Sequence, residues 1–263
     1  MSRQIGKLGK TATPENVHRF RTNSRRVEAL VAELAPENGN QKKLLKLLSK
    51  LRKKAGKVRD LDVHLAFLKE LRAADRQNQR TELLEWLGDE QERRSRKLAK
   101  SLDAETLRQL RKRLRRAQAE IKLDGIDPLD LAQKHLPDPG NTPLSERMLH
   151  ACRIEAKRAR YLAELASDFP RGRHFVQELK TAQDAIGEWH DIMKLKEQAE
   201  HRFGGVNDSP LVAALQNISR ARFRRAAGAL LSAVAALSES KKPVAVPSDH
   251  KPPQPALAQS AVA

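Results

Sequence analysis

The chain has 263 residues and a formal net charge of +18, from 51 Lys and Arg against 33 Asp and Glu. Its 39% hydrophobic content is too high for a disordered chain, and its 3% aromatic content is too low for a base-stacking platform. The excess of positive charge favours a polyanionic partner, which leaves nucleic acid, an anionic membrane and a phosphate polymer as candidates.

Helical spacing runs through nearly every apolar stretch, and strand-like alternation of β-branched residues is absent. The pattern therefore predicts an all-α fold. Helices are expected at residues 14–35, 41–56, 60–73, 77–101, 104–123, 143–168, 173–187, 191–203 and 210–238. Residues 240–263 contain five prolines and little large apolar content, which predicts a disordered, proline-rich tail.

The expected helix boundaries follow from capping and breaking residues. A hydroxyl side chain before a proline, typical of a helix start, occurs at Thr13-Pro14, Thr142-Pro143 and Ser209-Pro210. Gly56 and Gly187 are expected to break helices, so that Asp60 and Asp191 would cap the helices that follow. Each aspartate would also form a salt bridge to an arginine of the motifs described next.

Two motifs occur twice along the chain. The pattern His-x-x-Arg-x-x-x-Arg/Lys-Arg begins at His18 and again at His150, 132 residues later. The pattern Gly-x-x-x-Asp begins at Gly56 and again at Gly187, 131 residues later. Two motifs repeated at nearly the same interval predict two related helical bundles, at about 14–123 and about 143–238.

Each His/Arg motif lies on one side of its helix. At about 100° per residue, the four motif residues of the first copy share an arc of about 140°, opposite an apolar side. The second copy has the same arrangement, with Cys152 on the apolar side. Ile154 and Tyr161 are apolar residues on its basic side, where we expect them to meet a neighbouring element.

A row of lysines follows the first motif. Residues 1–70 hold 17 basic and 7 acidic side chains, so more than half of the net charge lies in the first quarter of the chain. Six lysines fall within about 100° of helical arc. This lysine stripe is formed by Lys42, Lys43, Lys46, Lys50, Lys53 and Lys57. Like charges at this spacing repel by a few tenths of a kcal/mol per close pair, which indicates a bound polyanion.

These motifs resemble those of the CHAD family, the conserved histidine α-helical domain. The resemblance is carried by V-H-R-F-R-T-N-S-R-R at Val17–Arg26, G-K-V-R-D-L-D-V at Gly56–Val63, L-H-A-C-R-I-E-A-K-R-A-R-Y at Leu149–Tyr161 and G-E-W-H-D-I at Gly187–Ile192. It implies a CHAD-like domain over residues 14–238, built from two similar four-helix bundles. It also implies binding of inorganic polyphosphate by a basic surface or channel, in a stand-alone protein without a triphosphate-hydrolysing domain.

The candidate polyphosphate-binding residues are the cations and histidines of these motifs and of the lysine stripe. They are His18, Arg21, Arg25, Arg26, Lys46, Lys50, Lys53, Lys57, Arg59, His150, Arg153, Lys157, Arg158 and His190. Arginine can fork onto two phosphate oxygens and lysine acts as a point charge, so a row of such groups suits a flexible phosphate chain. A solvated helix face is the alternative interpretation of the arginines. It is the favoured interpretation of the basic run Arg108–Arg116, which could otherwise extend the anion path.

Three roles are open for His18 and His150: metal ligand, structural hydrogen-bonding residue, or donor to phosphate. A metal site is disfavoured because neither has a His, Cys or carboxylate at ligand spacing, and the neighbouring cations would repel a divalent ion. We therefore expect no metal and no cofactor. A bound phosphate would raise the pKa of either histidine, which would link binding to protonation.

Non-catalytic binding of inorganic polyphosphate is the leading hypothesis, and a nucleic-acid-binding architectural helical protein is the alternative, supported by net charge alone. An enzyme with Asp60 and Asp191 as catalytic carboxylates is disfavoured, because the sequence lacks a Gly-rich phosphate loop and an activated nucleophile. The first residues lack a signal-peptide core, and no apolar window is long enough to span a bilayer. We expect a cytoplasmic location, with association at polyphosphate granules.

Overall fold

The computed structural model describes residues 13–72, 77–140 and 143–239. Over these ranges the chain contains helices and no strand, which confirms the predicted all-α fold. The elements are α2 (Pro14–Leu34), α3 (Gly39–Glu70), α4 (Gln79–Lys100), α5 (Ala104–Glu120), α6 (Pro128–Lys134), α7 (Glu146–Ala163), the 3₁₀ turn η1 (Glu164–Ala166), α8 (Pro170–Phe203) and α9 (Pro210–Glu239). The predicted tail at 240–263 lies outside the described residues.

Side-chain caps fix where several helices begin. The Thr13 hydroxyl accepts a hydrogen bond from the Asn16 backbone N–H at 3.2 Å, and α2 starts at the proline that follows Thr13, as predicted. The predicted start of α9 after Ser209 is also confirmed. In contrast, α7 begins at Glu146 with Ser145 as its cap, not at residue 143. The short helix α6, capped by Asp127, was not predicted.

Two of the expected helix breaks are wrong. Helix α3 runs through Gly56 and helix α8 runs through Gly187 without interruption. Asp60 and Asp191 consequently lie inside helices, and the prediction that they act as caps is wrong as well. A glycine inside a helix costs only about 1 kcal/mol relative to alanine. Buried apolar residues precede and follow both glycines, so that packing outweighs this cost.

Four hydrophobic clusters hold the helices together. One lies among α2, α3, α4 and α5, and two lie mainly among α6, α7, α8 and α9, where Trp189 and Cys152 are buried. The fourth joins Leu68 of α3 and Leu87 of α4 to Leu195 of α8. The two halves of the chain therefore share a core, and the boundaries of the two repeats stay a prediction.

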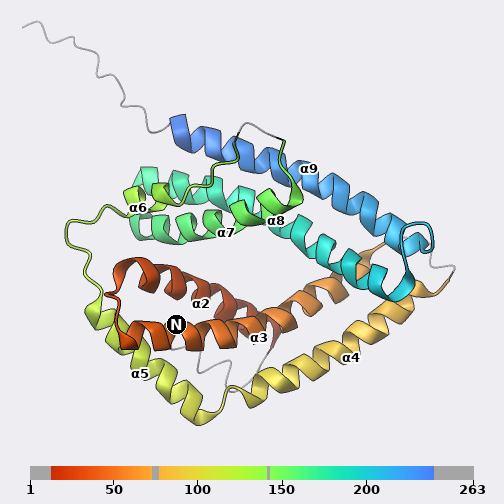
Figure 1. Ribbon diagram of the computed structural model, residues 1–263, viewed down its shortest axis with the longest axis horizontal. Coiled ribbons are helices and arrows are strands. Elements are labelled where there is room, and N and C mark those ends of the chain that lie inside the picture. The colour runs from red at the N-terminus through yellow and green to blue at the C-terminus, as the bar shows by residue number, and fades with distance from the viewer. Residues whose placement is uncertain (1–12, 73–76, 141–142, 240–263) are drawn as a thin grey trace, which may run out of the picture.

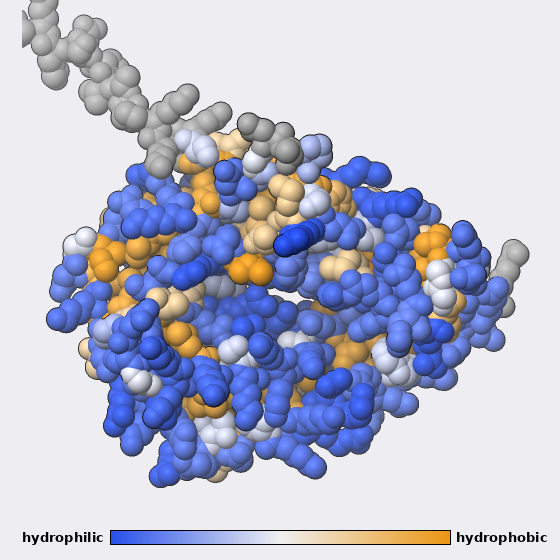
Figure 2. Space-filling model, viewed as in Figure 1, coloured by the Kyte–Doolittle hydropathy of each residue, from blue (hydrophilic) through white to orange (hydrophobic). Residues whose placement is uncertain are grey.

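The helices form two layers. Figure 1 shows α6, α7, α8 and α9 on one side and α2, α3, α4 and α5 on the other, with the two motif helices α2 and α7 facing each other across the middle. Figure 2 shows the surface hollowed between these layers, with mostly hydrophilic residues around the hollow. Within the described ranges, no helix has the length and apolar content that a membrane span requires.

Candidate anion-binding site

A cavity of 590 Å³ lies where α2 and α3 face α7 and α8. Eight lysine and arginine side chains line it, against two carboxylates, which makes it strongly cationic. The lining residues are Arg21, Arg25, Glu28, Ala29, Ala32, Arg52, Lys53, Gly56, Lys57, Asp60, His150, Arg153, Ile154, Lys157, Arg158, Tyr161 and His190. Nine of the fourteen candidate residues are therefore brought together in one place, from both copies of the motif.

The two motif helices present their cations to the cavity because their other sides are anchored in the core. On α2, Phe20 is fully buried while Arg21 and Arg25 reach the cavity wall. On α7, Ala156 is fully buried, and its neighbour Lys157 lines the cavity from the opposite layer. The duplicated helical pattern thus becomes two opposed cationic walls.

Helix α3 supplies the floor between these walls. A Cβ atom on Gly56 would lie 3.7 Å from the Arg21 Nε, so alanine would just touch Arg21 and a larger side chain would displace it. One turn further along α3, the Oδ1 of Asp60 lies 3.3 Å from the Arg21 Nη2. This ion pair confirms the predicted salt bridge from Asp60 to a motif arginine. Asp191 forms no such ion pair with the described residues, and burial raises its pKa.

Three recessed cations in the cavity have no ion-pair partner among the described residues: Arg25, Arg153 and Lys157. Burial, followed by repulsion from Arg153 and other arginines, lowers the pKa of Lys157 to about 5. Burial and repulsion from Arg21 lower the pKa of Arg25 to about 10. Burial also lowers the pKa of Arg153, and its Nε has no hydrogen-bond partner among the described residues. Arg25 is repelled by Arg21 and Arg153 when nothing is bound, and an anion between the walls would relieve that repulsion.

Two histidines close one side of the cavity. The His150 and His190 rings lie 5.2 Å apart between centroids, tilted by 41°. Burial and the charge of Arg153 lower the pKa of both, that of His190 to about 3. Both rings are therefore neutral at pH 7 and each can offer one N–H group to a phosphate oxygen.

Four candidate residues lie outside the cavity lining without an ion pair to the described residues. His18 is exposed on α2, and burial and the charge of Arg59 lower its pKa. Lys46 and Lys50 are exposed on α3, on the part of the lysine stripe that leads away from the cavity. These three residues and Arg59 do not form the walls of the cavity.

Two arginines of the motifs are engaged in ion pairs between the halves of the chain. The Arg26 Nε lies 2.6 Å from Glu164 Oε2, and its guanidinium lies 5.9 Å from the Tyr161 ring centroid. Arg26 therefore does not line the cavity. Arg158 does line it, but its Nη2 is paired with Glu33 of α2.

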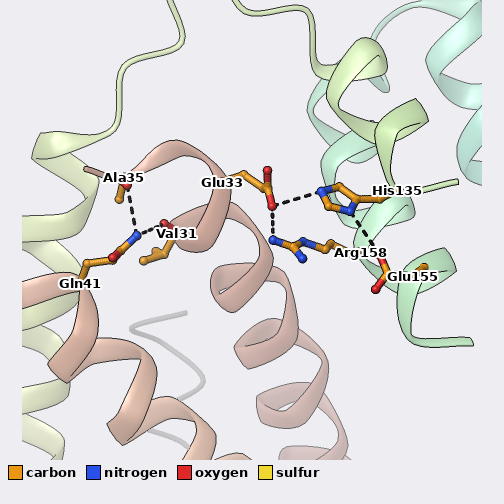
Figure 3. Close-up of polar contacts among 7 residues, drawn as sticks. All are labelled: Val31, Glu33, Ala35, Gln41, His135, Glu155 and Arg158. Carbon is orange, nitrogen blue, oxygen red and sulfur yellow. Dashed lines mark hydrogen bonds and ion pairs between the residues drawn. The ribbon is translucent and has the colours of Figure 1, made fainter. Parts of the chain in front are cut away.

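Glu33 also contacts His135, the residue at the C-terminal end of α6. Figure 3 shows His135 between two carboxylates, with Nε2 at 3.1 Å from Glu33 and Nδ1 at 3.2 Å from Glu155. Together with Arg158, this network fastens α2 to the opposite layer at one edge of the cavity.

Some lining residues were not predicted. Arg52 of α3 and Glu28 of α2 form an ion pair at 2.6 Å, and burial raises the pKa of Glu28. Glu28 lies seven residues after Arg21, on the same side of α2, so helical spacing could have indicated it. Nothing in the spacing of the lysine stripe indicates Arg52. Tyr161 is buried beside Arg26 and Arg160, as expected of a residue meeting a neighbouring element, whereas Ile154 is 54% exposed.

The described part of the chain also bears on metal binding. No group of three or more His, Cys, Asp or Glu side chains there is placed to hold a metal ion. His64, which was not a candidate, is buried on α3 with its Nδ1 3.1 Å from the Gln198 Oε1, and burial lowers its pKa.

Comparison with known proteins adds a family and a fold. A family model described as the CHAD domain matches residues 7–200 of the chain. The crystal structure of the CHAD domain from the plant Ricinus communis superimposes with a TM-score of 0.67 at 21% sequence identity, covering 89% of this chain and 86% of that one. No curated protein matches the chain.

Proposed function

Because the chain belongs to the CHAD domain family, we propose that it binds inorganic polyphosphate, without converting it, in the cavity between α2, α3, α7 and α8. The observation that carries this proposal is the recessed cluster of Arg25, Arg153 and Lys157, three basic side chains with no ion-pair partner among the described residues. Buried charge is costly unless it is paired. A chain of phosphates supplies a negative charge at every unit, so it would pair both arginines and favour the protonated form of Lys157.

The shape of the site favours a phosphate chain over duplex nucleic acid. The cations lie inside a 590 Å³ cavity between helices, where a single strand of phosphates fits and a double helix does not. Apart from the His150 and His190 rings, the lining contains one aromatic residue, Tyr161, and its 5% exposure leaves almost no face on which a base could stack. The lining groups are suited to holding phosphate oxygens through charge-assisted hydrogen bonds.

A direct test is a competition experiment with purified protein at two salt concentrations. Polyphosphate should bind with an affinity that falls steeply with salt, since cation–phosphate contacts release counterions. An excess of duplex DNA matched for phosphate should not displace it. Ready displacement by DNA would support the nucleic-acid alternative instead. Release of phosphate from the polymer in the presence of Mg²⁺ would contradict binding without turnover.

The proposed ligand also suggests a location for the protein in the cell. A protein that holds polyphosphate is expected where the polymer collects, so cytoplasmic polyphosphate granules are the proposed location. Imaging of a tagged protein in cells with and without the polymer tests this. A distribution that ignores the polymer would contradict it.

A further inference from the structure

The outward side of α5 carries a second concentration of positive charge. Leu107, Leu110 and Ala117 bury the inner side of this helix against α2, α3 and α4. The outward side, called here the α5 face, is formed by Arg108, Arg111, Lys112, Arg113, Arg115 and Arg116. Of these six cations only Arg108 forms an ion pair with a described residue, at 2.7 Å from Glu105. Two surface hollows, of 260 and 470 Å³, are lined by α5 side chains alone.

The α5 face adjoins the lysine stripe. The Asn40 Nδ2 donates a hydrogen bond to the Arg113 carbonyl at 3.3 Å, and the Asn38 Nδ2 donates one to Glu120 at 3.2 Å. These contacts hold the beginning of α3 against the last turns of α5, and Lys43 follows Asn40 by one helical turn on the same side of α3.

The lysine stripe then leads to the cavity. All six of its lysines are exposed, and none forms an ion pair with a described residue. Lys53 and Lys57, at its far end, line the cavity. From Lys43 to Lys57 the stripe spans about 21 Å at 1.5 Å per residue. Exposed lysines therefore follow one another along α3 from the cavity toward the end of the helix that contacts α5.

The side chains of the α5 face limit the classes of partner that can bind there. Residues 104–120 contain no aromatic side chain, so bases would find nothing to stack on. The apolar side of α5 is used in the protein core, so it is not available to enter a membrane. Figure 1 shows α5 running at an angle to α3, so a path that passes from one helix to the other changes direction. A flexible phosphate chain can follow such a bend, whereas duplex DNA is stiff over about 150 base pairs.

We propose that one polyphosphate chain anchored in the cavity continues along the lysine stripe and onto the α5 face, an inference that rests on the proposed function. The α5 face is then a second attachment segment for the same polymer. Chains too short to leave the cavity do not reach it. Longer chains gain affinity from it, because the second attachment is intramolecular once the first has formed.

The test compares the double variant Lys112→Gln/Arg116→Gln with a matched control, Arg220→Gln/Arg224→Gln on α9. Both remove two exposed cations spaced four residues apart and without ion pairs to described residues. Binding of tripolyphosphate, of long-chain polyphosphate and of duplex DNA is measured for each. The α5 variant should lose about tenfold in affinity for the long chain, as expected for two lost phosphate contacts, and keep its affinity for tripolyphosphate. The control should keep both.

Equal losses in the two variants would overturn the proposal for α5 and leave the cavity site standing. A loss confined to duplex DNA would overturn it too, by assigning the α5 face to nucleic acid. A third variant, Arg25→Gln/Arg153→Gln, tests the cavity site separately from the α5 face. It should lose affinity for both polymers, and retention of both would overturn the cavity site and the path that starts from it.

Discussion

The Nη2 of Arg21 lies 3.3 Å from the Oδ1 of Asp60, so the first His/Arg motif is joined to the Gly-x-x-x-Asp motif of the same half. The contact crosses the floor of the cavity beside Gly56. Both residues line the cavity, and the carboxylate competes there for the arginine that a phosphate would use.

Replacing Asp60 should therefore strengthen anion binding. Asp60→Asn removes a negative charge from the cavity and frees Arg21, and we expect polyphosphate affinity to rise about two- to fivefold, the value of a partly exposed ion pair. Glu92→Gln, on the exposed side of α4, removes the same charge away from the cavity and should change affinity little. Titration calorimetry measures both. A weaker complex in Asp60→Asn would show that Asp60 positions Arg21 for the ligand.

Lys157 should matter more for binding than for folding. Burial lowers its pKa to about 5, so the side chain is uncharged in the free protein at pH 7. Lys157→Met keeps the volume and should leave the unfolding temperature unchanged or raised. It should weaken polyphosphate binding about ten- to hundredfold, because a charge-assisted contact is lost. A large fall in unfolding temperature together with unchanged affinity would contradict this role.

Binding should take up protons. Bound phosphate favours the charged forms of Lys157, His150 and His190, whose pKa values are lowered in the free protein. Affinity should fall as the pH rises from about 6 to about 9, and calorimetry in two buffers of different ionisation enthalpy should show proton uptake. Lys157→Met should reduce the uptake. Binding that releases protons at neutral pH would contradict the proposed protonation.

In the free protein, the stability contributed by Lys157 should rise with pH, whereas the affinity for polyphosphate falls. Between about 5 and the ordinary value of 10.5, unfolded Lys157 binds a proton that the folded protein excludes. Its contribution to the free energy of unfolding therefore rises with pH across that window.

Two glycines of α8 should respond in opposite ways to alanine. A Cβ on Gly172 would lie 1.9 Å from the Ala166 carbonyl oxygen, which forces the start of α8 away from η1. Gly172→Ala should lower the free energy of unfolding by about 2 kcal/mol or more. Gly187 has open space around its Cβ position, and Gly187→Ala should raise stability by about 0.5–1 kcal/mol. Urea unfolding of both variants is the measurement, and equal effects would contradict an uninterrupted α8.

Glu33 should contribute to stability through the contacts in Figure 3. It accepts from both Arg158 and His135, which lie in the opposite layer. Glu33→Gln should cost about 1–2 kcal/mol in urea unfolding. Glu155→Gln, which affects only the more exposed contact of His135, should cost less. A larger loss of stability for Glu155→Gln would contradict this, because it would assign the main stabilising contact of His135 to Glu155 of α7 and not to Glu33 of α2.

The helical spacing of apolar and basic residues predicts much of the fold and of the site. It separated the basic and apolar sides of α2 and α7 correctly, because both sides are local properties of one helix. It did not show that α3 and α8 continue through Gly56 and Gly187, since that depends on packing against other helices. The partners of Arg26 and Arg158 lie 138 and 125 residues away, beyond what spacing can reveal. Arg52 of α3 likewise pairs with a residue of another helix, Glu28 of α2, so the spacing along α3 does not indicate its place in the site.

The central claim is that recessed cations of both motif copies hold one phosphate chain. The affinity for long-chain polyphosphate of Arg25→Gln/Arg153→Gln, measured at one salt concentration against Arg220→Gln/Arg224→Gln, tests it most directly. Both variants change the net charge equally, so only the position of the lost cations differs. We expect a loss of about hundredfold or more for the cavity variant, with its fold intact, and about twofold or less for the control. Equal losses in the two variants would contradict the claim.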